Sequence, residues 1–215
     1  MKLKMTSSFT VQYNQIVEDS NRCFNSGLTV KKHQVEGAEW CVDKELAGLP
    51  GAFISDEMGL GKTVIMLMTC LISRKTSTLI VLPSSILQQW SDQILKIAGH
   101  KCLIYYGQKK KKITTDMLLS NPIVITTYGT ISILKKNKHL PSTNLLHHVF
   151  WDRVIYDEAH HLRNKNANWH GASLIKSNFS WFITGTPIFF SKTRFILSVL
   201  FFLSFNIKER ILSKS

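Results

Sequence analysis

Short, nearly continuous runs of apolar residues alternate with longer amphipathic stretches along most of this chain. Runs of this kind are typical of parallel strands that are buried on both faces of a sheet. We expect strands at residues 52–55, 78–82, 103–106, 123–127, 153–156 and 181–184. Between them, apolar residues at helical spacing predict helices at 62–73, 84–98, 112–120, 129–136 and 168–177. An earlier helix should begin after Val30 and end at Gly48 and Pro50. This alternation predicts an α/β fold, with a parallel sheet flanked by helices on both faces.

Both ends of the chain depart from the alternation. Residues 1–27 are polar and aperiodic, so we expect an N-terminal extension before a lobe at 28–187. Residues 195–207, FILSVLFFLSFNI, are almost all apolar, but a membrane span needs about 20 such residues. We therefore expect residues 188–215 to form an apolar helix and tail that pack against the lobe, and we expect no membrane partner.

The charge of the chain is strongly positive. Twenty-seven Lys and Arg residues against 14 Asp and Glu residues give a formal net charge of +13. A domain this basic usually binds a polyanion, most often nucleic acid, although a chance excess of lysine is the other interpretation. The lysine run 109–112 falls in an expected loop, where it could follow phosphates or simply be solvated. Four cysteines without CxxC spacing favour a reducing compartment over a zinc site or a disulfide framework.

The motif DEMGLGKT at residues 56–63 joins an expected strand to an expected helix. Gly59 and Gly61 allow the backbone to curl and point its N–H groups at phosphate oxygens, and the helix N-terminus adds partial positive charge. Lys62 can reach the β- and γ-phosphates of a nucleotide, and the Thr63 hydroxyl can ligate Mg²⁺. Asp56 stands where the full P-loop pattern has its first glycine, yet GLGKT in this context still predicts a phosphate site.

The motif DEAH at residues 157–160 follows the apolar run RVIY. At the end of a strand, Asp157 can hold Mg²⁺ through water, and Glu158 can polarise the attacking water. Two adjacent carboxylates are costly to place together, and a bound cation removes that cost. The two motifs together therefore predict a site for a nucleotide and its metal ion.

These motifs and four others resemble the first motor lobe of the SWI/SNF-type DNA translocases, within the second helicase superfamily. The resemblance covers about residues 28–203 and includes HQVEGAEW at 33–40, VLPSSILQQW at 81–90, ITTYGT at 125–130, DEAHHLRN at 157–164 and TGTP at 184–187. It implies a RecA-like P-loop NTPase domain, ATP and Mg²⁺ as cofactors, and duplex DNA as the partner.

The resemblance also implies roles for individual residues. Gln34 would read the adenine, and the ATP site would comprise Gln34, Asp56, Glu57, Met58, Gly59, Leu60, Gly61, Lys62 and Thr63. The catalytic residues would be Lys62, Asp157 and Glu158, and the ligands of Mg²⁺ would be Thr63 and Asp157. The nucleotide would be coupled to the track by Thr184, Gly185 and Thr186.

The expected contacts with the nucleic-acid backbone are Ser84, Ser85, Thr126 and Thr127. All four lie at or just beyond expected strand ends, the edge of an open parallel sheet where ligands bind, and hydroxyls suit phosphate contacts. Each could equally cap a helix or close a turn.

The sequence departs from the family at two points. After TGTP the family usually continues with Ile-Gln-Asn, whereas here Ile188 is followed by Phe189 and Phe190, which removes two polar side chains near the nucleotide. The second motor lobe, which supplies arginines to the ATP site, is not found before Ser215. Such an arginine is worth about 10³–10⁵ in rate. We therefore expect weak ATP binding and poor hydrolysis from a chain that is a fragment, a decayed copy, or the partner of a separate chain supplying the second lobe.

The predicted function is that of the ATP-binding lobe of a DNA-dependent ATPase that translocates on double-stranded DNA, either in the nucleus or in a cytoplasmic viral factory. Two alternatives remain open at this point: a fragment of a DNA or RNA helicase that unwinds its substrate, and a non-catalytic remnant that binds nucleotide or nucleic acid.

Overall fold

The computed structural model describes residues 30–55, 59–73, 75–134 and 142–185. Six strands form a single sheet in the order β1-β6-β5-β2-β4-β3, and every pairing in it is parallel. The strands are β1 (Gly51–Ile54), β2 (Thr78–Leu82), β3 (Leu103–Ile104), β4 (Ile123–Thr127), β5 (Phe150–Tyr156) and β6 (Lys176–Ile183). The predicted parallel α/β sheet is confirmed.

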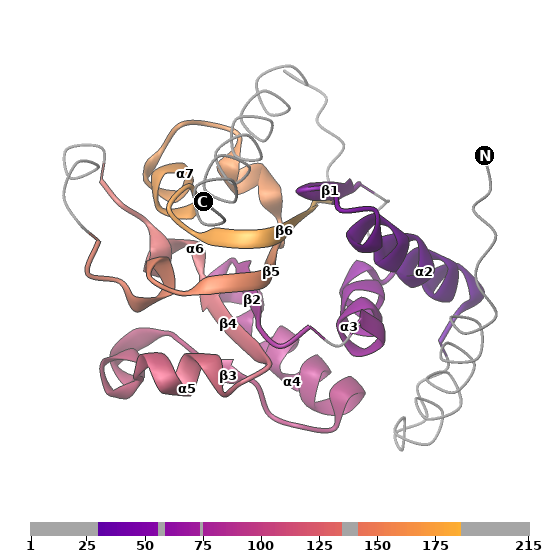
Figure 1. Ribbon diagram of the computed structural model, residues 1–215, viewed down its shortest axis with the longest axis horizontal. Helices are drawn as coiled ribbons and strands as arrows, with labels where there is room; N and C mark the ends of the chain where they lie inside the picture. The colour runs from indigo at the N-terminus through magenta and orange to yellow at the C-terminus, as the bar shows by residue number, and fades with distance from the viewer. Residues whose placement is uncertain (1–29, 56–58, 74, 135–141, 186–215) are drawn as a thin grey trace.

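Helices cover both faces of this sheet (Figure 1). They are α2 (Lys32–Leu46), α3 (Lys62–Ser73), α4 (Leu87–Ala98), α5 (Thr115–Leu119), α6 (Tyr128–Ile131) and α7 (Ala167–Ala172). The described residues also contain four short 3₁₀ turns: η1 (Ser84–Ile86), η2 (Gly107–Lys112), η4 (Leu145–His147) and η5 (Ala159–Leu162).

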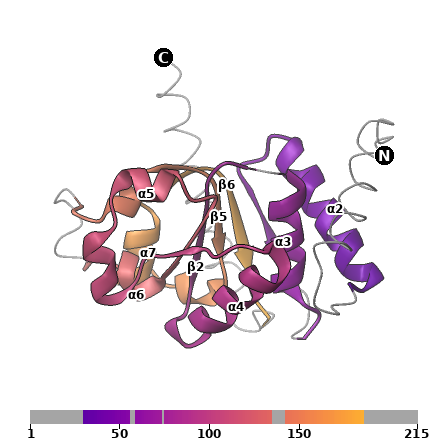
Figure 2. The ribbon, with the colours of Figure 1, turned by 90° about the horizontal axis from the view of Figure 1, so that it is seen from below.

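Alternate residues of the central strands build two separate cores. In β2, Ile80 and Leu82 pack with α2, α3 and α4, whereas Leu79 and Val81 pack with α5, α6 and α7. Figure 2 shows α2 and α3 on one side of the sheet and α5, α6 and α7 on the other. Because both faces are covered, all five residues of β2 are buried, which explains why the sequence shows a continuous apolar run and no alternation.

The register brings the carboxyl ends of the central strands to one edge. Leu82 lies opposite Thr127, Val81 opposite Tyr156, and Tyr156 opposite Phe182. The loops after β2, β4, β5 and β6 therefore leave the sheet side by side, and β1 ends at the same edge through its pairing of Ile54 with Ile183. Ligand sites of open parallel sheets form at this edge.

Several expected elements have other bounds in the structure, such as β3, which ends at Ile104, and α5, which covers only Thr115–Leu119. The helix predicted at 168–177 ends at Ala172, and Lys176 already begins β6. The helix prediction was wrong there because Ser177 and Ser180 are polar residues buried within β6, so this strand does not show a continuous apolar run. Their hydroxyls satisfy each other at 3.0 Å.

Two further differences concern the helix after β4 and the lysine run. The helix predicted from 129 starts at Tyr128 and ends at Ile131. The lysine run predicted as a loop forms the 3₁₀ turn η2, in which Lys110 is half-buried and the other three lysines are exposed.

A buried ion pair fastens the opposite, amino-terminal edge of the sheet. The Arg153 guanidinium donates from Nε to Oε1 of Glu45 at 2.5 Å and from Nη2 to Oε2 at 2.6 Å, and both side chains are almost fully buried. Trp181 Nε1 also donates to Oε1 of Glu45 at 2.9 Å. Further bonds from Arg153 reach the hydroxyls of Thr78 and Ser73. The pair therefore joins the end of α2 to α3, β2, β5 and β6.

Both ends of the chain fall outside the part that the structure describes, including the expected extension at 1–27 and the apolar stretch at 195–207. Among the helices that are described, none has the length and apolar character that a membrane crossing requires.

Candidate nucleotide and nucleic-acid site

The glycine loop connects β1 to α3 at the carboxyl edge of the sheet. Gly59 and Gly61 have φ angles of 91° and 81°, in the left-handed region that favours glycine. The first backbone bond of the helix runs from Ile65 N to Gly61 O at 3.1 Å. Lys62 and Thr63 are therefore the first residues of α3, both half-buried. Asp56, Glu57 and Met58 lie outside the described residues.

Gln34 of α2 lies directly against this loop. Its Nε2 donates to Leu60 O at 3.4 Å, and its Oε1 accepts from Lys31 N at 3.0 Å. The ring of His33 also approaches Leu60 O, with Nε2 at 3.1 Å. Gln34, the expected adenine reader, thus lies beside the glycine loop, and both polar atoms of its amide bind backbone groups of the chain.

Asp157 follows β5 at the centre of the carboxyl edge and makes four hydrogen bonds. Its Oδ2 accepts from Trp90 Nε1 at 2.7 Å, and its Oδ1 accepts from Glu158 N at 2.9 Å. Its backbone N–H donates to Val81 O at 2.9 Å, and its backbone carbonyl accepts from the Tyr128 hydroxyl at 2.8 Å. The carboxylate is therefore held in one orientation, as a metal ligand should be.

The surroundings of Asp157 favour a nearby cation. Burial raises the pKa of this carboxyl, while the Trp90 indole, the Glu158 N–H and the Lys62 ammonium act to lower it, and the net shift is upward. The glycine loop and the DEAH segment also leave the sheet at the same edge, because β1 and β5 both pair in parallel with β6. A buried carboxylate whose charge is incompletely compensated gains from an added positive ion.

Glu158 has an unusual backbone. Its φ and ψ are both 49°, and it is the one non-glycine residue with positive φ in the described ranges. Conformations of this kind cost about 1–3 kcal/mol and cluster at functional sites. The side chain is about a third exposed, and its Oε2 lies 3.1 Å from His160 Nδ1. The turn thus leaves the Glu158 carboxylate partly exposed, next in sequence to Asp157.

These residues fit a magnesium nucleotide. Among the described residues, no three His, Cys, Asp or Glu side chains gather as a metal site. Mg²⁺ usually binds through one or two protein oxygens together with phosphates and waters. Asp157 and the Thr63 hydroxyl can supply those oxygens at the mouth of the glycine loop.

The four expected nucleic-acid contacts fall into two pairs. Ser84 and Ser85 are exposed in η1, just past the end of β2. Thr126 and Thr127 are buried: the Thr126 hydroxyl donates to Tyr105 O at 2.8 Å, and Thr127 Oγ1 accepts from Thr130 N at 3.3 Å. Ser84 and Ser85 therefore present hydroxyls to solvent, whereas the two threonine hydroxyls bond within the lobe.

A groove of about 540 Å³ runs over the ends of β2 and β4. Its walls include Ser84 and Thr127, which the sequence singled out, and also Tyr106, Lys110, Tyr128 and His161. Sequence reasoning had assigned Tyr106 to packing and had noticed Tyr128 and His161 only within the motifs ITTYGT and DEAHHLRN. It had noticed the lysine run, but the sequence alone could not show that Lys110 is the lysine that faces the groove.

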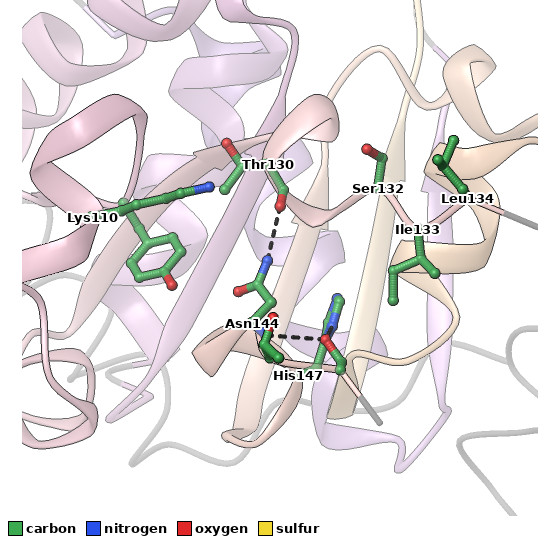
Figure 3. A pocket seen from close by; sticks show the side chains of 10 residues that line it. Lys110, Thr130, Ser132, Ile133, Leu134, Asn144 and His147 are labelled. Atoms are coloured by element: carbon green, nitrogen blue, oxygen red, sulfur yellow. Dashed lines mark hydrogen bonds between the residues drawn. The ribbon is translucent and has the colours of Figure 1, made fainter. Parts of the chain in front are cut away.

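A second hollow of about 500 Å³ adjoins the groove and shares Lys110 and Thr130 with it. Figure 3 shows Lys110 extending toward Thr130, whose carbonyl accepts from Asn144 Nδ2 at 2.8 Å. Nδ1 of His147 lies 2.6 Å from the Ser142 hydroxyl oxygen at its lower wall. Burial, and to a smaller extent His148, lower the pKa of His147 to about 4. Lys110 therefore lies between two polar hollows and brings a positive charge to both.

Thr184 and Gly185 are buried immediately after β6, and Thr184 N donates to Ile54 O at 3.1 Å. The expected coupling segment thus starts beside the strand that feeds the glycine loop. Thr186 lies outside the described residues.

A parallel sheet with a glycine loop after one edge strand and an acidic turn after a central strand defines the class of P-loop nucleotide-binding lobes. The chain belongs to the SNF2-related domain family, whose sequence model matches residues 33–211.

Relatives and solved structures agree with this assignment. An uncharacterized ATP-dependent helicase of Schizosaccharomyces pombe is 37% identical over 184 residues, which cover 74% of this chain and 18% of the relative. The DNA repair protein RAD5 of Debaryomyces hansenii is 36% identical over 176 residues, 64% of this chain and 14% of the relative. The SWI2/SNF2 ATPase core of Sulfolobus solfataricus, solved in complex with double-stranded DNA, has a TM-score of 0.69 and 25% identity, over 81% of this chain and 36% of that one. The chain thus spans less than a fifth of the length of these two curated relatives.

Proposed function

We infer that this chain is the ATP-binding lobe of a DNA-dependent ATPase that moves on duplex DNA. The observation that carries the inference is that Lys62, on the first turn of α3, and Asp157, after the end of β5, both lie at the carboxyl edge of the sheet. A lysine on a glycine loop and a buried carboxylate at the same edge are the two groups that phosphoryl transfer from a magnesium nucleotide requires.

Each residue has a definite task in this proposal. The backbone N–H groups of the loop at Gly59 and Gly61 cradle phosphate oxygens, and Lys62 neutralises the β- and γ-phosphates. When bound, Mg²⁺ supplies further positive charge to the same oxygens. Asp157 and Thr63 orient its coordination sphere, and Glu158 accepts a hydrogen bond from the attacking water and aligns it. Gln34, beside the loop, is placed to contact the base.

The groove at Ser84 and Lys110 supports a polynucleotide backbone as the second ligand. Hydroxyls and a lysine amine bind phosphates without reading bases. The net charge of +13 attracts a polyanion, and the structurally similar Sulfolobus solfataricus core was solved with double-stranded DNA. These observations favour duplex translocation over the unwinding helicase and over the non-catalytic remnant. Relatives named as DNA repair proteins favour the nucleus over a cytoplasmic viral factory.

Full activity in this proposal needs a second lobe, either in a longer protein or in a separate chain. The resemblance to SWI/SNF-type motors implies that this lobe supplies arginines to the γ-phosphate. Such arginines stabilise the charge of the transition state by about 10³–10⁵ in rate. Slow hydrolysis by the present chain, with retained nucleotide binding, is therefore the expected behaviour.

Titration calorimetry with ATP in magnesium buffer tests the phosphate site. Lys62→Ala should weaken binding at least tenfold, whereas Lys96→Ala, at the exposed end of α4, should leave the affinity unchanged. Thermal unfolding without nucleotide should be similar for both variants. Equal ATP affinity in the wild type and Lys62→Ala would refute the assignment.

A further inference from the structure

Among the described residues, the hydrogen bonds that Asp157 makes outside its own turn go to two segments, VLPSSILQQW and ITTYGT. These are also the segments that form the groove, through Pro83, Ser84, Thr127 and Tyr128. The carboxylate assigned to the nucleotide side is therefore held by residues of the nucleic-acid side.

We propose that Trp90 and Tyr128 are positioning residues that couple nucleic-acid contact in the groove to the orientation of Asp157. The proposal rests on the proposed function, because it assumes that the groove binds nucleic acid and that Asp157 serves the nucleotide. Neither residue touches the nucleotide; each acts through Asp157.

The connection through Trp90 is short and rigid. Ser84 and Ser85 lie exposed in η1, and Leu87 N donates to Ser84 O, so that α4 continues directly from this turn. Trp90 lies one turn into α4, is 2% exposed, and donates to Asp157 Oδ2 at 2.7 Å. A phosphate that binds the η1 hydroxyls and shifts the start of α4 must therefore shift the indole N–H or break its bond to the carboxylate.

The connection through Tyr128 is more direct. Tyr128 is one of the residues that line the groove, and its buried ring packs against His161, with ring centroids 5.1 Å apart. Its hydroxyl donates to Asp157 O at 2.8 Å. One residue thus belongs to the wall of the groove and also binds the backbone of the nucleotide-side acid. The two connections bind different atoms of Asp157, and together they fix both its carboxylate and its peptide plane.

Coupling of this kind is reciprocal. If DNA changes the affinity for the nucleotide by some factor, the nucleotide changes the affinity for DNA by the same factor, commonly about 5–150-fold. A purely structural role for Trp90 and Tyr128 would instead lower stability and affinity without changing that ratio. The ratio therefore separates a positioning role from a packing role.

The test compares Trp90→Phe and Tyr128→Phe with two matched controls. Trp151→Phe removes another buried indole bond, from Nε1 to Leu146 O at 3.2 Å, and Tyr156→Phe removes another buried hydroxyl bond, to Ala172 O at 3.3 Å. For each protein, calorimetry gives the Kd of Mg²⁺·ATP with and without saturating short duplex DNA.

We expect the two Kd values to differ by about fivefold or more in the wild type and in both controls. In the Trp90 and Tyr128 variants their ratio should be near one. A second readout uses the indole N–H resonances: the one lost in Trp90→Phe should shift when duplex DNA alone is added, and the one lost in Trp151→Phe should stay in place.

Three results would overturn the coupling: a ratio of one in the wild type, an unchanged ratio in both test variants, or an equal loss of the ratio in the controls. All three leave the nucleotide site intact if the wild type binds Mg²⁺·ATP without DNA. Failure of the wild type to bind Mg²⁺·ATP under either condition would instead refute the proposed function itself.

Discussion

A Cβ atom on Gly61 would collide with Nε2 of Gln34. Because Nε2 ends a flexible side chain, the Gln34 amide would have to leave its position against Leu60 O, while α2 itself need not move. The glycine is therefore what allows the Gln34 amide to bind the phosphate loop. The same glycine also has a φ of 81°. Two separate constraints, one steric and one conformational, therefore act at a single position, and Gly59 shares only the second of them.

Alanine substitutions separate these two constraints. Gly59→Ala meets nothing within 4 Å and has a φ of 91°, so it should cost only backbone strain, about 1–2 kcal/mol. Gly61→Ala should cost more, because it adds the clash, and it should also abolish ATP binding. Chemical denaturation measures the stabilities. Adding Gln34→Ala should restore part of the stability of Gly61→Ala and none of that of Gly59→Ala; equal effects in both backgrounds would contradict the packing.

The lysine run offers a comparison within six residues. Lys110 lines both hollows, whereas Lys109 and Lys111 are exposed on the same turn. All three alanine variants remove one positive charge, so a diffuse electrostatic effect would weaken duplex binding equally. A phosphate bound by Lys110 predicts that Lys110→Ala lowers the slope of log K against log salt by about one, and the other two variants by less.

Fluorescence titration of a short duplex at three or more salt concentrations supplies those slopes. The affinity should show little sequence preference, since hydroxyl and amine contacts to phosphates carry no base information. Identical slopes for the three variants would remove Lys110 from the nucleic-acid path.

Glu158 should show a conflict between stability and function. Because its φ is 49°, Glu158→Gly relieves strain but increases the freedom of the unfolded chain, and the net gain should be about 0.5–1 kcal/mol. Glu158→Gln keeps the backbone preference and should not change stability. Both variants should bind Mg²⁺·ATP, and both should lose about 100-fold or more in phosphate release with duplex DNA.

Melting curves and a phosphate-release assay on the same samples check both halves of this prediction. Wild-type hydrolysis rates in Glu158→Gln would show that another group aligns the water. A destabilised Glu158→Gly would show that the positive φ is not a source of strain.

The ion pair between Arg153 and Glu45 should dominate the effects of charge substitutions on stability. Glu45→Gln leaves a buried guanidinium without its counter-charge, which typically costs about 3–5 kcal/mol. Replacing both residues with Met should cost less than Glu45→Gln alone, since no uncompensated charge remains. The surface pair of Lys32 and Glu36, at 3.7 Å on α2, is the control, and Glu36→Gln should change stability by only about 0.3 kcal/mol.

Urea denaturation of the four proteins gives the comparison. If Glu45→Gln were as stable as Glu36→Gln, the buried pair would contribute nothing to holding α2 against the sheet.

The parts that the sequence predicted best are those set by local pattern. The bounds of α3, β2 and β4 follow from apolar runs bordered by glycine, proline and serine, and the structure has them as expected. The start of β6 was missed because the buried hydroxyls of Ser177 and Ser180 form a hydrogen bond with each other within the strand. Hydrophobicity does not reveal such a bond. Local pattern fails where polar residues are buried in pairs.

The candidate site shows the same limit at longer range. The motifs named Asp157, and Trp90 is the last residue of the motif VLPSSILQQW, but nothing in the sequence joined them across 67 positions. Their hydrogen bond exists because β2 and β5 are neighbours in the sheet and α4 packs back over their ends. That relation depends on strand order, which the sequence pattern alone leaves open. The position of Lys110 beside the groove likewise depends on the fold and not on the lysine run itself.

The position of the buried ion pair has a consequence for how such a lobe can change over evolution. Arg153 lies opposite Thr78, the first residue of β2, at the amino-terminal edge of the sheet. Asp157 and the glycine loop lie at the carboxyl edge. Substitutions that change the nucleotide site or the groove therefore act on loops at the other edge, and they leave the ion pair between Arg153 and Glu45 intact. A copy of the domain could lose its chemistry one residue at a time and still fold, so an intact fold is weak evidence of an intact motor, and activity has to be judged at the carboxyl edge alone.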